Sequence, residues 1–258
     1  MSLSPALASP ATAVIVTGGA SGIGLACAQA LAAVGRPVAL WDIDGKRAAD
    51  AAQAVADSYG TRAVGIAIDL RDLGAIEAAL AATREAVGAP GGLVHAAGIV
   101  DIGSLDGMTA ESWDSGIAIH LRSLAFIIQA IRADLAAQKG SAIVAIASIN
   151  ATLGNAANPI YSAAKGGILS LVRSLADRLA ADGVRINSVS PGQIMTPMLK
   201  PSVDALPQGF YERRILLGRL GEPEEIGRVV RFLLSDEASY VTASEIVVDG
   251  GNISSQRG

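Results

Sequence analysis

The stretch TGGASGIG, residues 17–24, places four glycines between an apolar run and a helical pattern. It follows AVIV (13–16) and precedes LACAQALAAVG (25–35). A strand ending at Thr17 and a helix beginning near Gly22 would bring bare backbone amides and the positive end of the helix dipole to one point, where an anion is stabilised. The stretch therefore predicts a turn that binds phosphate, although glycine-rich turns without a ligand also occur.

Short apolar runs alternate with helical patterns along nearly the whole chain. The runs lack strict polar alternation, as expected of strands buried on both faces. Seven strands are predicted, at 12–17, 37–42, 63–69, 92–97, 141–148, 184–190 and 244–250. Helices are predicted near 22–35, 45–59, 71–88, 110–138, 158–182 and 223–235. This order predicts an α/β fold, a single Rossmann-type doubly wound domain with a seven-stranded parallel sheet and helices on both faces, whose ligands bind beyond the carboxyl ends of the strands.

Composition narrows the classes of partner. The 258 residues carry a formal net charge of −4 and no cluster of Lys or Arg, which argues against nucleic acid and membranes and favours a small-molecule ligand. No run of about 18 apolar residues predicts a membrane span, and residues 1–11 form a loose tail and not a signal peptide. The single cysteine, Cys27, can form neither an internal disulfide nor a metal cluster, so no metal is predicted. We therefore expect one cytoplasmic domain over 12–258.

An acidic residue stands at the end of the second predicted strand. Asp42 lies 18 residues after Gly24, where a carboxylate accepts hydrogen bonds from the adenosine ribose hydroxyls and repels a 2′-phosphate. We therefore expect NAD and not NADP as cofactor. Lys46 and Arg47 follow closely and leave NADP open, and a helix cap or turn is the structural alternative for Asp42.

Two further motifs point to the same edge of the sheet. YSAAK (161–165) places Tyr161 and Lys165 four residues apart, and therefore side by side on a helix, while the strand at 141–148 ends at Ser148. Taken alone, such a Tyr and Lys are usually a buried ring and a solvated ammonium. Because ligands of this architecture bind at the carboxyl ends of the strands, the two motifs together favour a catalytic cleft.

In this order, the motifs resemble those of the short-chain dehydrogenase/reductase family over 12–251. TGGASGIG resembles the family's cofactor turn, and HAAG (95–98) resembles its Asn-Asn-Ala-Gly strand signature. SPGQIMTPM (190–198) resembles its Pro-Gly segment, and VDGG (248–251) its last strand. The resemblance implies an oxidoreductase that transfers a hydride between NAD(H) and a secondary alcohol or carbonyl compound.

The resemblance also implies the roles of the site residues. Ser148 would hold the substrate oxygen, Tyr161 would act as general acid/base, and Lys165 would bind the nicotinamide ribose. An ammonium about 4 Å from the phenol would lower the pKa of Tyr161 by about three units. The residues implied to contact the cofactor are Gly18, Ser21, Gly22, Ile23, Gly24, Asp42, Asp69, Ala97, Gly98, Tyr161, Lys165, Pro191, Ile194 and Thr196.

Both histidines of the chain occupy positions where this family usually places Asn. His120 aligns with its fourth catalytic residue, and His95 with an Asn of the strand signature. For His95 we expect structural hydrogen bonding. For His120 a proton-relay role and a structural role are both open, and a relay role predicts an ionisation near pH 6.5 in the activity profile.

The implied substrate loop spans 196–218 and is rich in apolar residues. These residues either form a movable lid or pack as a helix on their own segment, and Asn150, Asn155 and Asn158 flank the cleft. The apolar residues are Met198, Leu199, Val203, Leu206, Phe210 and Tyr211. A sugar, a polyol, a hydroxy acid, a steroid and an acyl thioester all remain open as substrates.

Two functions from different classes follow. The first is an NAD-dependent enzyme, which the intact Ser148, Tyr161 and Lys165 favour; the second is an NAD-binding sensor or scaffold whose chemistry has lapsed at His120. The resemblance further implies a homotetramer. Apolar rows that one sheet face does not fully cover would contribute to its contacts, namely Leu121, Leu124, Ile128 and Ile131.

Overall fold

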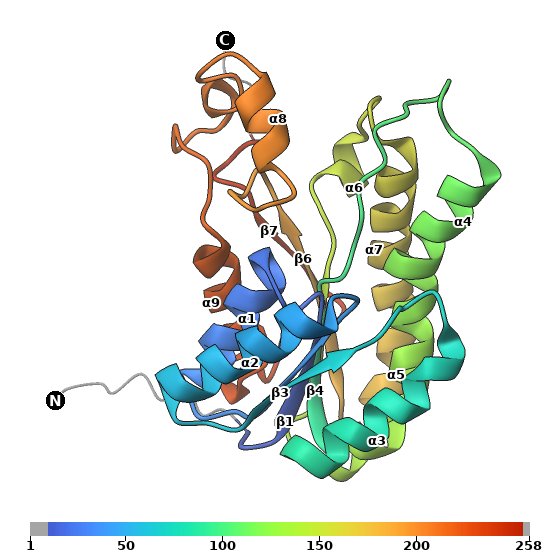
Figure 1. Ribbon diagram of the computed structural model, residues 1–258, viewed down its shortest axis with the longest axis vertical. Helices are drawn as coiled ribbons and strands as arrows, with labels where there is room; N and C mark the ends of the chain where they lie inside the picture. The colour runs from blue at the N-terminus through green and yellow to red at the C-terminus, as the bar shows by residue number, and fades with distance from the viewer. Residues whose placement is uncertain (1–9, 255–258) are drawn as a thin grey trace, which may run out of the picture.

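The computed structural model describes residues 10–254, and its strands form one parallel sheet (Figure 1). The strand order is β3-β2-β1-β4-β5-β6-β7. The strands are β1 (Ala13–Thr17), β2 (Val38–Asp42), β3 (Ala63–Ala67), β4 (Pro90–His95), β5 (Ala142–Ile146), β6 (Arg185–Pro191) and β7 (Glu245–Val248). The predicted fold class and all seven predicted strands are confirmed, since each strand end lies within two residues of its predicted position. Residues 1–9 of the predicted tail lie outside the described residues.

Helices cover both faces of the sheet because successive strand residues point to opposite sides. In β1, Ile15 packs among α3, α5 and α7, whereas Val14 and Val16 pack among α1, α2 and α9. The helices are α1 (Gly22–Ala32), α2 (Gly45–Tyr59), α3 (Ile76–Val87), α4 (Ala110–Ile117), α5 (Ser123–Ala137), α6 (Asn150–Leu153), α7 (Pro159–Ala180), α8 (Lys200–Ala205) and α9 (Pro223–Leu233). The six predicted helices are therefore present, and the short α6 and α8 are additional.

The helix predicted at 110–138 is not regular throughout. Thr109 begins α4 with a capping box to Ser112, and a π-helical turn over Ala118–Arg122 then separates α4 from α5. Single π-turns inside α-helices often occur at functional sites. His120 lies in the middle of this turn.

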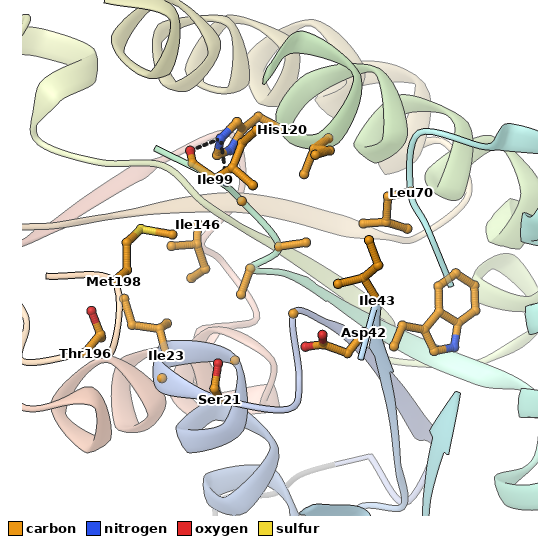
Figure 2. Close-up of a pocket in the computed structure, with 18 of the residues that line it drawn as sticks. Ser21, Ile23, Asp42, Ile43, Leu70, Ile99, His120, Ile146, Thr196 and Met198 are labelled. Carbon is orange, nitrogen blue, oxygen red and sulfur yellow. Dashed lines mark hydrogen bonds between the residues drawn. The ribbon is translucent and has the colours of Figure 1, made fainter. Parts of the chain in front are cut away.

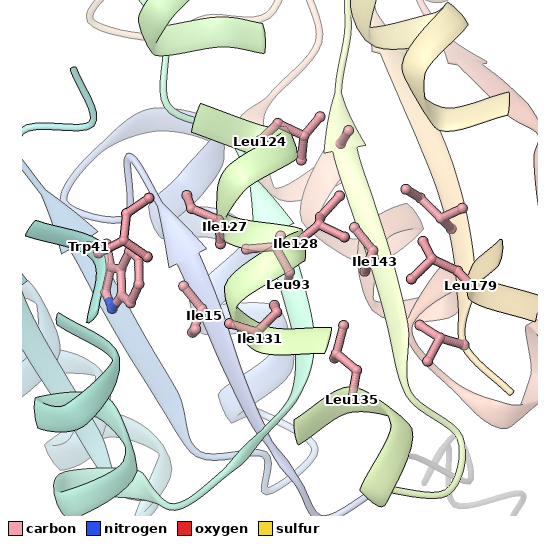
Figure 3. Packing of buried hydrophobic residues seen from close by; sticks show 14 of the residues in the cluster. Ile15, Trp41, Leu93, Leu124, Ile127, Ile128, Ile131, Leu135, Ile143 and Leu179 are labelled. Atoms are coloured by element: carbon pink, nitrogen blue, oxygen red, sulfur yellow. The ribbon is translucent and has the colours of Figure 1, made fainter. Parts of the chain in front are cut away.

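Most of the apolar row on this helix is covered, and the expectation that the sheet leaves it partly uncovered is wrong for three of its four residues. Leu124, Ile128 and Ile131 are buried in the core between α5 and the sheet (Figure 3), whereas Leu121 is only partly buried and packs against the same cluster. The larger exposed side chains on this helix belong to Trp113 and Phe126, which are 42% and 44% exposed.

The same helical stretch, Ala110–Ala137, has the length and mean hydropathy, 1.3, that a bilayer-crossing helix needs. The sequence prediction missed this because it considered only uninterrupted apolar runs. Its packing explains the hydropathy, since Leu124, Ile127 and Ile131 form part of the hydrophobic core with β1 and β4 (Figure 3). A core helix passes the same test of length and composition.

The direction of the chain through the sheet creates a crevice beside β1. β1 leads into α1 on one face, whereas its neighbour β4 leads into α4 and α5 on the other. The loops after these two strands therefore diverge, and ligands of open α/β sheets bind where that happens.

Candidate active site

A cavity of about 290 Å³ opens at the carboxyl ends of the strands (Figure 2). Figure 2 shows Ser21 and Asp42 toward one end of the cavity and His120 toward the other. Most predicted site residues line it, namely Gly18, Ser21, Gly22, Ile23, Gly24, Asp42, Asp69, Ala97, Gly98, His120, Tyr161, Lys165 and Thr196. The structure therefore brings the expected cofactor turn and the expected catalytic residues to one cavity.

Three predicted residues within the described chain do not line this cavity. Ser148 is buried but forms a hydrogen bond with the Tyr161 side chain, so it belongs to the catalytic group. The Pro191 carbonyl accepts from the Ile149 amide at 3.1 Å, and Ile194 packs in the core. Cofactor contact by Pro191 and Ile194 stays a prediction.

The glycine turn has the shape that a pyrophosphate needs. Gly18 and Gly22 have φ values of +65° and +52°, which favour glycine. A Cβ on Gly24 would lie 2.1 Å from the Gly18 carbonyl oxygen, and a Cβ on Gly18 would lie 2.9 Å from the Ala97 amide nitrogen. The turn is therefore closed to side chains and presents its backbone, with the N-terminus of α1, to the cavity.

Asp42 is held in place by the backbone around it. Its Oδ2 accepts from the Ala20 amide and its Oδ1 from the Asp44 amide, both at 3.1 Å. The nearby cations are paired elsewhere, because Lys46 contacts Asp50 at 2.6 Å and Arg47 contacts Asp44 at 3.4 Å. This end of the cavity therefore offers a fixed carboxylate.

Asp69, the second acidic residue at this end, carries its own cation. Arg71 contacts the Asp69 carboxylate at 2.6 Å, and this hydrogen bonding lowers the pKa of Asp69. Asp69 is therefore ionised, and its charge is already balanced by Arg71 before any ligand binds.

A buried hydrogen-bond chain joins β1, β4 and the π-turn. Thr17 Oγ1 accepts from the amides of Ala96 and Ala97, both at 3.2 Å, so its hydroxyl proton donates to His95 Nδ1 at 3.0 Å. His95 Nε2 then carries the ring proton and donates to the His120 carbonyl at 3.1 Å. The structural role expected for His95 matches these contacts, and burial followed by the Lys165 charge lowers its pKa to about 3.

His120 presents an unpartnered nitrogen inside the protein. Its Nε2 lies 2.8 Å from the Ile99 carbonyl oxygen and 3.1 Å from the Ile99 amide nitrogen, whereas the buried Nδ1 has no partner among the described residues. The ring also meets the Tyr161 ring edge-on, with centroids 5.4 Å apart. A Cβ on Gly98 would lie 2.3 Å from His120 Cε1, so only glycine leaves room for this ring.

The surroundings of His120 do not favour the ionisation near pH 6.5 that a titrating relay predicts. Burial and the neighbouring Lys165 charge lower its pKa to about 3, because both oppose a second positive charge. The ring is therefore neutral at physiological pH. A neutral ring can still pass a proton or hold a water molecule through Nδ1.

Lys165 and Tyr161 share a face of α7, but their charges differ from the sequence expectation. Lys165 Nζ donates to the Ile146 carbonyl at 2.6 Å and lies 5.4 Å from the centroid of the Tyr161 ring. Burial lowers the pKa of Lys165 to about 7. It also raises the pKa of Tyr161, against a smaller lowering by the Ser148 hydrogen bond, so the predicted lowering is wrong for the protein without cofactor.

Asp101 belongs to this site and was missed from the sequence. Its Oδ1 accepts from the Tyr161 amide at 2.9 Å and its Oδ2 from the Ile160 amide at 3.4 Å. The N-cap of α7, Asn158, forms no side-chain cap bond, so a residue about sixty positions away supplies the cap. Local capping patterns cannot reveal such a partner.

The apolar lining was also missed for the most part. Ile43 and Leu70 flank the Asp42 end, whereas Ile99, Ile119 and Ile146 lie toward the catalytic end. Of the expected lid residues only Met198 lines this cavity. Val203, Leu206, Phe210 and Tyr211 instead surround a second hollow of about 220 Å³.

The doubly wound sheet, the closed glycine turn and the Ser148-Tyr161-Lys165 group define the class of the protein, a Rossmann-type oxidoreductase. A family model described as enoyl-(acyl carrier protein) reductase matches residues 18–252. The chain belongs to the short-chain dehydrogenase/reductase family.

Three similar proteins differ widely in their named substrates. The chain is 34% identical over 247 residues to 2-(S)-hydroxypropyl-CoM dehydrogenase 3 of Xanthobacter autotrophicus, covering 92% of this chain and 95% of that one. It is 35% identical over 237 residues to the 3-oxoacyl-[acyl-carrier-protein] reductase FabG of Escherichia coli, with the same coverage. The crystal structure of L-sorbose reductase from Gluconobacter frateurii, with NADPH and L-sorbose, superposes with a TM-score of 0.90 at 26% identity, covering 97% of this chain and 99% of that one.

Proposed function

We propose that this protein transfers a hydride between NAD(H) and a secondary alcohol or its ketone, with Tyr161 as general acid/base. The observation that carries the proposal is the cavity that joins the glycine turn and Asp42 to Tyr161 and Lys165. A nicotinamide dinucleotide fits these residues, because the turn admits a pyrophosphate where a Cβ would not fit. The bound nicotinamide supplies or accepts the hydride.

The side chains divide the remaining work. Ser148 Oγ accepts from the Asn150 amide at 3.1 Å, which leaves its hydroxyl proton for the substrate oxygen. Burial keeps Tyr161 protonated, so the phenol is ready to donate to that oxygen during reduction. Lys165, with a pKa of about 7, gains or loses a proton easily at neutral pH, so it can serve as the proton reservoir for Tyr161.

Asp42 supports NAD over NADP. The carboxylate is oriented by two backbone amides, and Lys46 and Arg47 are engaged by carboxylates, so a 2′-phosphate would meet a fixed negative charge. The sorbose reductase structure holds NADPH, so the fold alone does not select NAD, which makes Asp42 the residue to test.

Titration of both cofactors tests this choice. We expect NADH to bind at least tenfold more tightly than NADPH, because a phosphate and a carboxylate in close contact repel by more than about 1.4 kcal/mol. Asp42→Ala should weaken NADH binding and improve NADPH binding. Equal affinities in the unchanged protein would contradict the assignment, and Asp57→Ala, an exposed carboxylate on α2 that pairs with Gln53 and, among the described residues, with no cation, is the matched control.

Tyr161→Phe tests the chemistry itself. The variant keeps the ring and removes the proton, so we expect turnover to fall by at least a hundredfold with NADH affinity within about twofold. Absorbance at the reduced-nicotinamide band measures turnover, and fluorescence titration measures NADH affinity. The alternative, an NAD-binding sensor or scaffold, predicts cofactor binding without turnover in either protein. The assembled Ser148, Tyr161 and Lys165 favour the enzyme.

Assembly and location complete the proposal. A homotetramer stays a prediction, now supported by exposed Trp113 and Phe126 in place of the covered leucines and isoleucines. A cytoplasmic location and a small-molecule substrate, without nucleic acid or membrane partners, also stay predictions.

A further inference from the structure

Exposed apolar side chains gather where β4, β5 and β6 end. Ile99, Val100, Ile102 and Leu105 follow β4, Leu153 follows β5, and Met198 follows β6; we call these six residues the apolar mouth. Ile102 is 86% exposed, Leu105 72% and Leu153 60%. Since these strands are adjacent and parallel, the six residues belong to one edge of the sheet. Exposed apolar side chains that gather at the ligand-binding edge of a sheet commonly belong to a binding surface.

The apolar mouth is continuous with the catalytic cavity. Ile99 and Met198 line the cavity and are also 42% and 49% exposed at the surface. Deeper in, Ile119 and Ile146 continue the apolar lining toward Tyr161. Figure 2 shows Met198, Ile146 and Ile99 along the same side of the cavity as His120. A substrate whose oxygen reaches Tyr161 therefore leaves the rest of its skeleton against hydrocarbon.

The wall formed by the loop after β4 is fixed without any ligand. Ser104 Oγ donates to the Ala156 carbonyl at 2.8 Å, and the Ser104 amide donates to the Ala157 carbonyl at 3.2 Å. Asp101 holds the same loop to the first turn of α7. The exposure of Ile102 and Leu105 is therefore a feature of an anchored loop.

Charge around the mouth excludes anionic substrates. The three segments 99–108, 149–160 and 192–199 contain no Lys, Arg or His, and their charged residues are Asp101 and Asp106. The next cation along the chain, Lys200, is paired with Asp204 at 2.9 Å. A carboxylate or phosphate on the substrate would therefore meet the negative charge of Asp101 and Asp106 and find no cation within these three segments.

The amide side chains beside the mouth are already engaged. Asn150 Nδ2 donates to Asn158 Oδ1 at 3.3 Å, and Asn155 Oδ1 accepts from the Ala157 amide at 3.0 Å. Gln193 Oε1 accepts from Asn252 Nδ2 at 2.6 Å. Each of these amides keeps unused donor or acceptor positions, so the preference for hydrocarbon over a sugar or polyol rests on the apolar side chains that outnumber them at the mouth.

We infer that the substrate is an uncharged secondary alcohol or ketone with an apolar substituent of several carbons, which lies in the apolar mouth. This inference rests on the proposed hydride transfer. It predicts that sugars, polyols, hydroxy acids and carrier-bound acyl groups, which the fold also accommodates, are poor substrates of this protein.

A panel of matched ketones with NADH tests the inference. The pair 2-butanone and 2-octanone varies chain length; 3-oxobutanoate and its ethyl ester vary charge; L-sorbose represents the sugars. Each buried methylene adds up to about fourfold in kcat/KM, so we expect 2-octanone to exceed 2-butanone by at least tenfold. The ester should exceed its acid by at least tenfold, and L-sorbose should be the poorest substrate.

Ile102→Asn locates the effect at the mouth. Because this side chain is exposed, the variant should fold normally and lower the 2-octanone to 2-butanone ratio of kcat/KM by about threefold or more, with 2-butanone little changed. Tyr59→Asn is the matched control. Tyr59 is also exposed, and it ends α2, at the edge of the sheet opposite the mouth. A within-enzyme ratio is independent of the fraction of folded protein.

Different failures have different meanings. Preference for L-sorbose or 3-oxobutanoate, no dependence on chain length, or an Ile102→Asn variant with an unchanged ratio would each overturn the substrate class and leave the hydride transfer standing. Absence of NADH oxidation with every ketone, together with normal NADH binding, would contradict the proposed function itself.

Discussion

At the scale of single residues, burial decides the charges that the sequence leaves open. His95 and His120 both have a pKa of about 3, and Lys165 one of about 7, chiefly because burial disfavours a charged ring or ammonium. Spacing in the sequence shows that Lys165 lies near Tyr161, but it shows neither the depth of the pair nor the histidines that crowd them. The protein therefore keeps both histidines uncharged at physiological pH.

His120 acts as a neutral hydrogen-bonding group in this account. We expect the activity profiles of the unchanged protein and of His120→Asn to coincide between pH 5 and 8, because the ring does not titrate in that range. Turnover of His120→Asn should stay within a few fold. His120→Ala should lose at least tenfold, because it leaves the Ile99 carbonyl without its donor and empties the space beside Tyr161.

Initial rates across this pH range, with cofactor affinity measured alongside, check the expectation. An acid-side ionisation near pH 6.5 that disappears in His120→Asn would restore a titrating relay and contradict the low pKa. Equal turnover of His120→Ala and the unchanged protein would reduce His120 to packing.

At the scale of elements, the loop after β4 connects the two halves of the catalytic group. Its backbone at Ile99 hydrogen-bonds with His120 in the π-turn, and Asp101 accepts from the amide of Tyr161 at the start of α7. A single loop residue, Val100, thus separates the contacts that position the imidazole and the phenol. Small changes in this loop should therefore act on catalysis more than on cofactor binding.

Asp101→Ala tests this positioning role. Loss of the cap costs about 1 kcal/mol of helix stability and frees the first turn of α7, so we expect kcat to fall about tenfold with NADH affinity unchanged. Asp101→Asn, whose amide oxygen still accepts from Tyr161, should restore most of the rate. Ser104→Ala is the control, since it loosens the same loop at Ala156 and leaves the Tyr161 amide bonded.

A fall in kcat shared equally by Asp101→Ala and Ser104→Ala would show a general effect of loop order. No rescue by Asp101→Asn would assign the loss to the negative charge and not to the hydrogen bonds.

The regular elements were predictable because their signals are local. The seven strands are short apolar runs, and α2 matches its predicted bounds of 45–59, since Asp44 caps its start and Gly60, with φ of +64°, ends it. The glycine turn and the spacing of Tyr161 and Lys165 are local in the same way. The π-turn at 118–122 and the cap from Asp101 were not, because both depend on contacts between distant segments.

At the scale of the whole molecule, Tyr161 and Lys165 lie at the carboxyl ends of the strands, between the hydrophobic clusters that cover the two faces of the sheet. Ile168, Leu169 and Val172 anchor α7 in the layer with α3 and α5, and this packing carries Lys165 into the interior. The fold thus buries an ammonium whose nearest hydrogen-bond partner is a neutral carbonyl, that of Ile146. Such a group is expected to cost stability in exchange for its place in the site.

The pH dependence of stability measures that cost. Below pH 7 Lys165 is charged in both the folded and the unfolded chain, so the full penalty of its burial applies. Between about pH 7 and its ordinary pKa of 10.5 the folded chain has lost the proton and the unfolded chain still holds it, so the contribution of this group makes the protein more stable as pH rises. Each pKa unit is worth about 1.4 kcal/mol, so the difference between 10.5 and about 7 sets an upper value on the order of 5 kcal/mol.

Lys165→Met should therefore stabilise the protein without cofactor, by about 2–4 kcal/mol at pH 6 and by much less at pH 10, while it abolishes turnover. Urea unfolding at a series of pH values measures the difference. Lys139→Met, at an exposed position after α5, is the control and should leave the pH dependence unchanged. A Lys165→Met protein that is less stable at pH 6, or whose difference from the unchanged protein is the same at pH 6 and pH 10, would show that the buried ammonium is compensated by the fold.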